Sequence, residues 1–346
     1  MVKTMKKVRV GVIGCGSVAR RRHLLEYASN EQAEIVAVVD LVEERAQEMA
    51  ELYQAKAFTD YKEALAECDL DAVSVCLPNH LHASVTIDAL KAGLHVLCEK
   101  PMAISAEEAE AMISTAKEYD RKLMIGHNQR FVASHQQAKK LLDSGELGKV
   151  YSFKTTFGHP GPEGWSIDGR ASWFFNTEEA FIGALGDLGV HKSDLIRYLL
   201  GDVAEVGAFV ETSAKENTEI DDNAMCILKM KSGAIGSLAA SWSYVSGGDN
   251  STYIYTEKAV LKIEADPVYP LVVSYSNGDT VNYELAKIQS NEEGGQTKTY
   301  VVDRFIEAIT QDKEPLITGE EGLKSLNVIL AALESNRTKR FVNLDQ

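Results

Sequence analysis

The chain has 346 residues, 45% of them hydrophobic and 25% charged, which are the proportions of a globular protein long enough for two domains that each bury a core. Lys and Arg number 36 against 51 Asp and Glu, so the formal net charge of −15 disfavours nucleic acid or a membrane surface as the main partner, and no stretch reaches the ~18 apolar residues of a membrane span. The five cysteines form no CxxC pair, so we expect no disulfide framework, no metal site and a reducing, cytoplasmic environment.

Residues up to about 126 alternate short β-branched runs with longer amphipathic segments. Five runs are predicted to be buried strands: Val8–Ile13, Ile35–Val39, Ala72–Cys76, His95–Cys98 and Leu123–Ile125. Four segments between them are predicted to be helices: Ser17–Ala28, Glu43–Tyr53, His80–Ala92 and Ala106–Asp120. Because strands that alternate with helices form right-handed βαβ units, we expect an α/β domain with a parallel sheet covered on both faces.

The pattern changes after a bridging segment, Phe131–Gly148. The strands predicted beyond it are Val150–Thr156, Glu205–Val210, Ala224–Met230, Ala234–Trp242, Tyr253–Tyr255, Ala259–Ile263, Leu271–Tyr275 and Thr280–Leu285. The helices predicted are Gly186–Leu200, Val301–Thr310 and Thr318–Glu334. Such runs of strands indicate an α+β domain with a large, mostly antiparallel sheet. We expect domains at residues 1–126 and 127–346, with C-terminal helices that can pack back on the first.

A glycine-rich turn directly follows the first predicted strand. Residues 14–19, Gly-Cys-Gly-Ser-Val-Ala, fit the pattern G-x-G-x-x-G/A, in which the first glycine permits a tight turn and the second lets the backbone approach a pyrophosphate. This motif alone is often an ordinary turn, but here a strand precedes it, a helix follows it and an acidic residue ends the second strand. We expect four of its residues to bind a dinucleotide, namely Gly14, Gly16, Ser17 and Val18.

Asp40 is the acidic residue at the end of the second predicted strand. A carboxylate at this position accepts hydrogen bonds from the ribose hydroxyls of NAD and repels the 2′-phosphate of NADP. Asp40 can also cap the helix that starts near Val42, and the two roles are compatible. The basic run at residues 20–22 is either a solvated helix face or a group that reaches a phosphate. We expect NAD as the cofactor, with NADP less favoured.

Two further turns end predicted strands of the parallel sheet, at Leu77–His82 and at Glu99–Pro101. Ligands of such sheets bind beyond the carboxyl ends of the strands. Five residues of these turns are therefore expected to contact the cofactor: Leu77, Asn79, His82, Glu99 and Lys100. Asn79 can equally be a helix cap, His82 a structural histidine and Lys100 a surface residue before a proline.

In the second half, Asp187 and His191 open the helix predicted at Gly186–Leu200. Their i, i+4 spacing projects both side chains from one face of that helix. Such a pair is more often a surface ion pair than a catalytic site.

Together these motifs resemble those of the Gfo/Idh/MocA family, the glucose–fructose oxidoreductase and inositol dehydrogenase group. The matching residues are the glycine turn Gly14–Ala19, Pro78-Asn79-x-x-His82, Glu99-Lys100-Pro101, Gly126–Phe131 and Asp187-x-x-x-His191, spread over nearly the whole chain. The resemblance implies a Rossmann domain followed by an α+β domain with an open sheet, NAD(P), and chemistry at a secondary alcohol of a sugar or cyclitol. It also implies a homodimer or homotetramer, usually packed through the open sheet. Ala184 departs from the glycine-rich stretch of many relatives.

By this resemblance Lys100, Asp187 and His191 match the catalytic triad of the inositol dehydrogenase-like members. Imidazole suits a general base near neutral pH, so we expect His191 to take the proton of the substrate hydroxyl. Lys100 would stabilise the developing alkoxide, while Asp187 would orient His191 or hold a neighbouring hydroxyl.

The segment Gly158–Ser172 is rich in Gly and Pro and is predicted to be an active-site loop. The aromatic residues from Trp165 to Phe175 suit a sugar ring, although they can equally anchor the loop by packing. Four residues are expected to contact the substrate: Arg130, Trp165, Arg170 and Trp173.

The leading hypothesis is an NAD-dependent dehydrogenase that acts on a sugar, a sugar derivative or inositol. One alternative is a non-catalytic dinucleotide-binding sensor or regulator of the same fold. Another is a reductase or imine-forming enzyme for an amino acid-like substrate, whose carboxylate Arg130 and Arg170 would bind. The presence of Lys100, Asp187 and His191 together favours the dehydrogenase, because a sensor has no need of that set.

Overall fold

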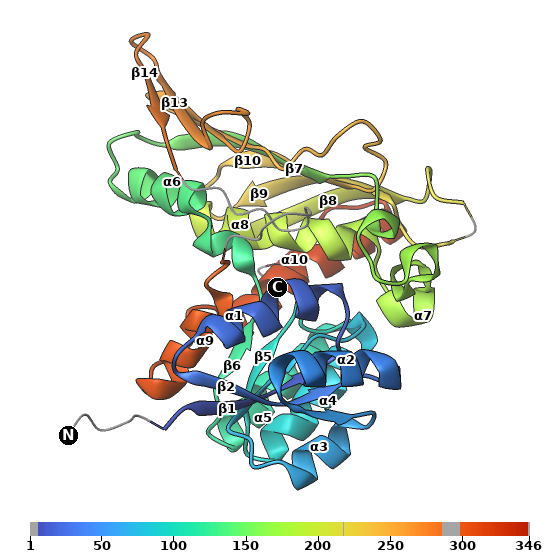
Figure 1. The fold of residues 1–346 in the computed structure, drawn as a ribbon. Helices are drawn as coiled ribbons and strands as arrows, with labels where there is room; N and C mark the ends of the chain where they lie inside the picture. Colours follow the sequence, from blue (N-terminus) through green and yellow to red (C-terminus); the bar gives the residue numbers. More distant parts are fainter. Residues whose placement is uncertain (1–5, 217, 286–297, 345–346) are drawn as a thin grey trace, which may run out of the picture. The chain divides into compact units, whose positions relative to one another are not determined.

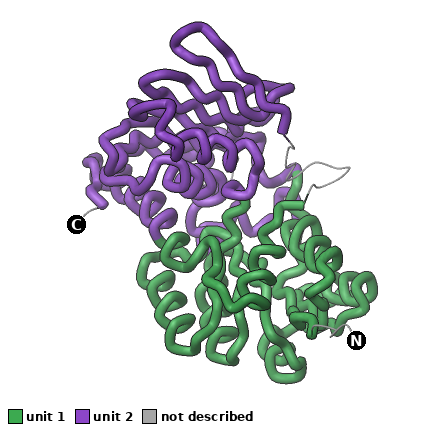
Figure 2. Tube along the Cα trace, turned by 90° about the vertical axis from the view of Figure 1, so that its left-hand side faces the viewer, with its two compact units in different colours: residues 1–128, 165–167, 289–323 green, residues 129–164, 168–288, 324–346 purple. Residues whose placement is uncertain are grey.

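The computed structural model describes residues 6–216, 218–285 and 298–344 (Figure 1). These residues form two compact units, which Figure 2 shows in green and purple. The first holds the described parts of residues 1–128, 165–167 and 289–323, and the second those of residues 129–164, 168–288 and 324–346. No helix in these described ranges is long and apolar enough to cross a membrane.

The first unit is built on a parallel sheet of six strands in the order β3-β2-β1-β4-β5-β6. The strands are β1 (Val8–Ile13), β2 (Ala33–Val39), β3 (Lys56–Phe58), β4 (Ala72–Val75), β5 (His95–Cys98) and β6 (Leu123–Ile125). The helices are the π-helical turn Ala19–His23 continuing into α1 (Leu24–Ser29), then α2 (Glu43–Tyr53), α3 (Tyr61–Glu67), α4 (His82–Lys91), α5 (Ala106–Glu118), α9 (Val301–Thr310) and the first residues of α10 (Gly319–Thr338). This strand order is that of a Rossmann fold, which confirms the expected α/β architecture.

The central strands β1 and β4 are apolar on both faces because helices cover both sides of a parallel sheet. Val10, Val12, Val73 and Val75 are accordingly fully buried. The strand order reverses between β1 and β4, so the turns after these two strands flank the switch point at which ligands bind in such sheets. Strand β5 lies beside β4 and brings a third turn to the same edge.

Strand β3 and helix α3 are absent from the sequence prediction. Strand β3 has three residues at the edge of the sheet, and Lys56 and Ala57 are exposed. Helix α3 buries only Ala64, and it starts where the Asp60 side chain accepts a hydrogen bond from the amide of Lys62. Neither element therefore carries an apolar periodicity that a sequence reading can detect.

The second unit is built on a nine-stranded sheet in the order β14-β13-β12-β11-β7-β10-β9-β8-β15. The strands are β7 (Val150–Gly158), β8 (Val203–Glu211), β9 (Asn223–Met230), β10 (Ile235–Ser241), β11 (Thr252–Thr256), β12 (Ala259–Ile263), β13 (Leu271–Tyr275), β14 (Thr280–Tyr283) and β15 (Val342–Asn343). The helices are α6 (Ala133–Asp143), α7 (Thr177–Ala180), the π-helical turn Leu185–Gly189 continuing into α8 (Val190–Leu200), and the rest of α10. All neighbouring strands are antiparallel except β7 and β10, which confirms the predicted mostly antiparallel sheet.

One face of this sheet is covered by helices, among them α6 and α8, while none of the described helices lies on the other (Figure 1). Buried and exposed residues consequently alternate along β9. The open face is nevertheless apolar over β8, β9 and β10, where Phe209, Met225, Ile227 and Ile235 are each more than half exposed.

The eight strands predicted for this half are all present, with ends that differ by about two residues at most. The predicted bridging segment contains α6, which was missed because its middle, Gln136–Lys140, is largely polar. The predicted loop Gly158–Ser172 holds only short 3₁₀ turns at Pro162–Gly164 and Gly169–Ala171.

Candidate active site

The glycine turn after β1 has the backbone shape that the motif requires. Gly14 has a φ of +96°, and a Cβ atom built there would lie 2.2 Å from the carbonyl oxygen of Cys76 at the end of β4. Only glycine fits at this position. A Cβ built at Gly16 meets no described atom within 4 Å, so the chain itself leaves the space beside this residue open.

Asp40 lies against this turn and is half-buried. Its Oδ2 accepts a hydrogen bond of 2.9 Å from the amide of Cys15, and its Oδ1 accepts one of 2.9 Å from the amide of Val42. The carboxylate therefore fixes the glycine turn and also bonds a backbone amide at the start of α2. Arg20, in the basic run at residues 20–22, donates hydrogen bonds to the carbonyl of Cys15 and to Glu48. Its guanidinium therefore also stabilises the glycine turn.

Ser17 holds a short segment that is distant in sequence. Its hydroxyl donates to the carbonyl of Trp165 over 3.1 Å and accepts from the amide of Ile167 over 2.9 Å. These contacts attach residues 165–167 to the first unit. Val18 has helical dihedral angles and directly precedes the π-helical turn Ala19–His23.

His82 stabilises the turn after β4 through contacts of both its ring nitrogens. The imidazole is 1% exposed, with Nδ1 2.7 Å from the carbonyl oxygen of Pro101 and Nε2 2.8 Å from that of Leu77. Burial lowers the pKa of His82 despite these two carbonyls. His82 thus connects the turns after β4 and β5. Asn79, 4% exposed, lies in the 3₁₀ turn Asn79–Leu81.

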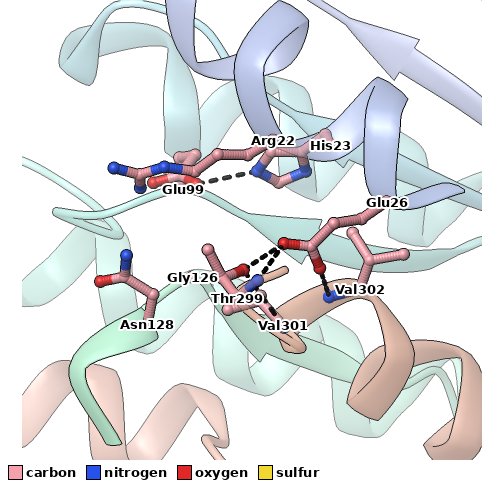
Figure 3. A pocket seen from close by; sticks show the side chains of 9 residues that line it. All are labelled: Arg22, His23, Glu26, Glu99, Gly126, Asn128, Thr299, Val301 and Val302. Carbon is pink, nitrogen blue, oxygen red and sulfur yellow. Dashed lines mark hydrogen bonds and ion pairs between the residues drawn. The ribbon is translucent and has the colours of Figure 1, made fainter. Parts of the chain in front are cut away.

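Glu99 points into the unit, where it meets His23 (Figure 3). The carboxylate lies 2.8 Å from His23 Nε2, and its other oxygen accepts from the amide of Lys100 over 3.2 Å. His23 Nδ1 lies 3.0 Å from the hydroxyl of Ser74, which in turn lies 2.8 Å from that of Tyr27. Burial alone would raise the pKa of Glu99, but the contact with His23 holds it below its usual value.

This buried network fixes the backbone from which Lys100 extends, and the Lys100 residue itself is half-buried. A small cavity beside it is lined by the residues labelled in Figure 3, among them Glu99, Gly126 and Asn128. A Cβ atom at Gly126 would lie 3.1 Å from a carboxylate oxygen of Glu99, so a small residue is needed there.

In the second unit Asp187 lies in the π-helical turn and His191 in the first turn of α8, and each is 6% exposed. The start of this helix is fixed by Asp221, whose carboxylate accepts from the amides of Gly183 and Leu185 over 2.6 and 2.8 Å. Burial raises the pKa of Asp221 although these amides lower it. Ala184, the departure from the glycine-rich pattern, fits here fully buried.

Aromatic residues surround this pair. Asp187 Oδ2 accepts a hydrogen bond of 3.2 Å from the indole of Trp242, and the ring of Phe157 lies 5.8 Å from that of His191. His159 also packs edge-on against Phe157, with 6.1 Å between ring centroids. The sequence predicted no role for Trp242 or Phe157, because an aromatic residue at or beside the end of a strand usually indicates only core packing, and it included His159 only as part of the loop Gly158–Ser172.

The residues expected to bind substrate have different environments. Arg130 makes a two-point ion pair of 2.8 and 2.6 Å with the fully buried Asp194, so its guanidinium holds α8. Arg170 is exposed in the 3₁₀ turn Gly169–Ala171. Trp173 is half-buried and stacks on Phe174 with 3.9 Å between ring centroids.

Comparison with known proteins identifies the family. Residues 8–127 match the model of an oxidoreductase family with an NAD-binding Rossmann fold, and residues 135–262 match the GFO/IDH/MocA C-terminal domain. A dTDP-3,4-didehydro-2,6-dideoxy-alpha-D-glucose 3-reductase from Saccharopolyspora spinosa is 31% identical over 236 residues, 67% of this chain and 68% of that protein. The chain belongs to the Gfo/Idh/MocA family.

Two further relatives extend over nearly the whole chain. Myo-inositol 2-dehydrogenase from Thermotoga maritima is 29% identical over 350 residues, which cover 98% of this chain and 99% of that enzyme. A levoglucosan dehydrogenase structure in complex with NADH and levoglucosan superposes with a TM-score of 0.87 at 26% identity, covering 99% of this chain and 100% of that one.

This Gfo/Idh/MocA protein is thus an NAD-binding oxidoreductase, as the sequence predicts. Its first unit fits the cofactor, because the glycine turn leaves open space at Gly16 and lies beside the carboxylate of Asp40. Bound NAD would supply the acceptor or donor of a hydride.

Proposed function

We propose that this family member oxidises or reduces a secondary alcohol of a sugar, a sugar derivative or inositol. The observation that carries the proposal is the buried pair Asp187 and His191, with an indole donor on the carboxylate and an aromatic ring against the imidazole. A buried carboxylate and imidazole are better suited to proton transfer than the same pair on a solvated surface. The names of the relatives, which act on inositol, levoglucosan and a deoxysugar, support this substrate class.

Each of the three residues has a role that follows from its chemistry. His191 takes the proton of the reacting hydroxyl, or returns it in the reverse direction. Lys100 donates a hydrogen bond to the reacting oxygen and stabilises its developing negative charge. Asp187 orients His191 or holds a neighbouring hydroxyl. Residues 1–126 would then serve the cofactor and residues 127–346 the substrate.

The test is a turnover assay of the purified protein with NAD and a panel of cyclitols, anhydrosugars and aldoses, followed by the absorbance of reduced cofactor. Turnover of at least one polyol is expected. If NADH binds but no member of the panel, in either direction, is converted, the enzyme assignment fails and a dinucleotide sensor is the better description.

Asp40 gives a prediction about cofactor choice. Asp40→Ser removes the charge that repels a 2′-phosphate, so the preference for NADH over NADPH should fall by about tenfold or more. Dissociation constants from cofactor fluorescence measure this. Glu44→Ser is the matched control, because it removes an exposed carboxylate from the first turn of α2 and should leave the preference unchanged. An undiminished preference in Asp40→Ser would contradict the repulsion argument.

We further propose that a second copy of the chain covers the open face of the nine-stranded sheet. Phe209, Met225, Ile227 and Ile235 expose more apolar surface there than a solvated sheet face usually carries. Light scattering is expected to give the mass of a dimer or tetramer, and the double change Met225→Glu with Ile227→Glu should give a monomer. Leu52→Glu, at another exposed apolar residue, should not change the mass. A protein that is monomeric at micromolar concentration would refute this assembly.

The five cysteines are all free, and four are buried. Unpaired thiols support our proposal that the protein works in a reducing compartment such as the cytoplasm.

A further inference from the structure

Trp242 lies immediately after β10 and is fully buried. Its indole nitrogen donates a hydrogen bond of 3.2 Å to Asp187 Oδ2, and an indole has no other polar group. A tryptophan in a core needs a partner for this N–H, and here the partner is a carboxylate that we assign to the reaction. The hydrogen bond therefore links a buried core residue directly to Asp187, a candidate catalytic residue.

Both ends of this hydrogen bond are held by backbone contacts. The amide of Asp187 bonds the carbonyl of Gly183 over 2.8 Å, and Gly183 is in turn held by Asp221. The amide of Trp242 bonds the carbonyl of Asp222 over 2.7 Å. Two adjacent residues, Asp221 and Asp222, thus fix the helix start that carries Asp187 and the strand end that carries Trp242.

Small residues lie where helix and strand meet. A Cβ atom built at Gly189 would lie 3.4 Å from the Cβ of Ala240, in β10. The π-helical turn therefore packs directly on β10, the strand that precedes Trp242.

The ring of Trp242 is also held from the side by two phenylalanines. Phe174 and Phe175 meet it edge-on, at 6.2 Å and 5.9 Å between ring centroids. Phe174 stacks in turn on Trp173, a residue that we expect to meet the substrate. These contacts hold the indole in one orientation, and they connect it to the Trp173 segment.

We propose that Trp242 is a positioning residue for the reaction, acting through Asp187. Its N–H holds one oxygen of the carboxylate, which fixes the plane of the carboxylate and the direction of its second oxygen. The acceptor is a carboxylate, so the bond belongs to the charge-assisted kind. The inference rests on the proposed function, since it assigns Asp187 to the chemical step.

The test starts from Trp242→Phe, which keeps an aromatic ring in the core and removes the donor. The kcat should fall by about ten- to a hundredfold, as expected for a lost hydrogen bond to a charged group. The dissociation constant of NADH should stay within about twofold, because the glycine turn and Asp40 belong to the other unit.

A double-mutant cycle separates positioning from packing. Asp187→Asn alone lowers kcat, and adding Trp242→Phe to it should cost little more, because the charged acceptor is already gone. A role in packing alone predicts that the two losses multiply. A kcat within about twofold of wild type in Trp242→Phe, or fully multiplicative losses, would overturn the proposal.

A second readout does not depend on turnover. The chain has three tryptophans, so the ¹⁵N-labelled protein should show three indole N–H signals, of which Trp242→Phe identifies one. Asp187→Asn should shift that signal, since its acceptor loses its charge, and leave the Trp165 and Trp173 signals in place. An unmoved Trp242 signal refutes the bond. If the signal moves but the wild type converts no polyol, the proposed function fails and the bond stands.

Discussion

Lys100→Met is expected to lower kcat by about 10²- to 10³-fold while the protein still folds and binds NADH. The ammonium group is the cation that we assign to the reacting oxygen, and removal of one such donor typically costs this much in rate. Lys100 is half-buried, and contacts of Glu99, His23 and His82 fix the backbone at this turn. Methionine keeps the length of the side chain, so stability should change little. Steady-state kinetics and a thermal melt measure the two effects.

Lys91→Met is the matched control, because Lys91 is an exposed residue at the end of α4 in the same unit. It removes the same charge from the same unit, so an effect of net charge on binding or rate would appear in both variants. Near-normal turnover by Lys100→Met, with normal affinity for NADH, would remove Lys100 from the chemistry.

Local motifs were predictable because their physics is local. The turn at Gly14 was found from sequence because a tight turn between a buried strand and a helix demands glycine, and the structure gives Gly14 a positive φ. Helix α5 was also predicted, and its start is fixed locally, because the side chain of Ser105 accepts a hydrogen bond from the amide of Glu108. In both cases the determinants lie within a few residues of each other.

The direction in which a motif side chain points was not predictable. His82, Glu99 and Arg130 were expected to contact a cofactor or a substrate, and the structure shows that each also has a buried protein partner that the sequence did not predict. One partner of each, namely Pro101, His23 and Asp194 respectively, lies at least 19 residues away along the chain. The packing of these distant segments decides which face of a turn is buried. The spacing of residues within a motif does not predict it.

The link between Asp187 and Trp242 shows the same limit, because 55 residues separate them and only the packing of the π-helical turn on β10 brings them together. Sequence reasoning placed Asp187 at the catalytic site but treated Trp242 as the end of a strand. A fully buried tryptophan near a motif carboxylate is a signal that can be used only once the fold is known.

The glycine turn supplies a second prediction with a large effect. Gly14→Ala should abolish NADH binding and lower the melting temperature by roughly 5–10 °C. The new Cβ would lie 2.2 Å from the carbonyl oxygen and 2.8 Å from the carbonyl carbon of Cys76, both backbone atoms that cannot turn aside. The residue would also have to hold a φ near +96°, which side chains other than glycine rarely adopt. Relief of the clash would push the ends of β1 and β4 apart at the switch point.

Gly16→Ala separates binding from folding at the same turn. Its Cβ meets no described atom within 4 Å, so the melting temperature should stay within about 2 °C of wild type. The affinity for NADH should nevertheless fall by more than tenfold, because the family motif places a glycine here to let the backbone approach the pyrophosphate. Calorimetric titration with NADH and a thermal melt of both variants give the comparison. If Gly16→Ala binds NADH as tightly as wild type, the open space at Gly16 is not where the cofactor binds, and the assignment of the glycine turn must be withdrawn.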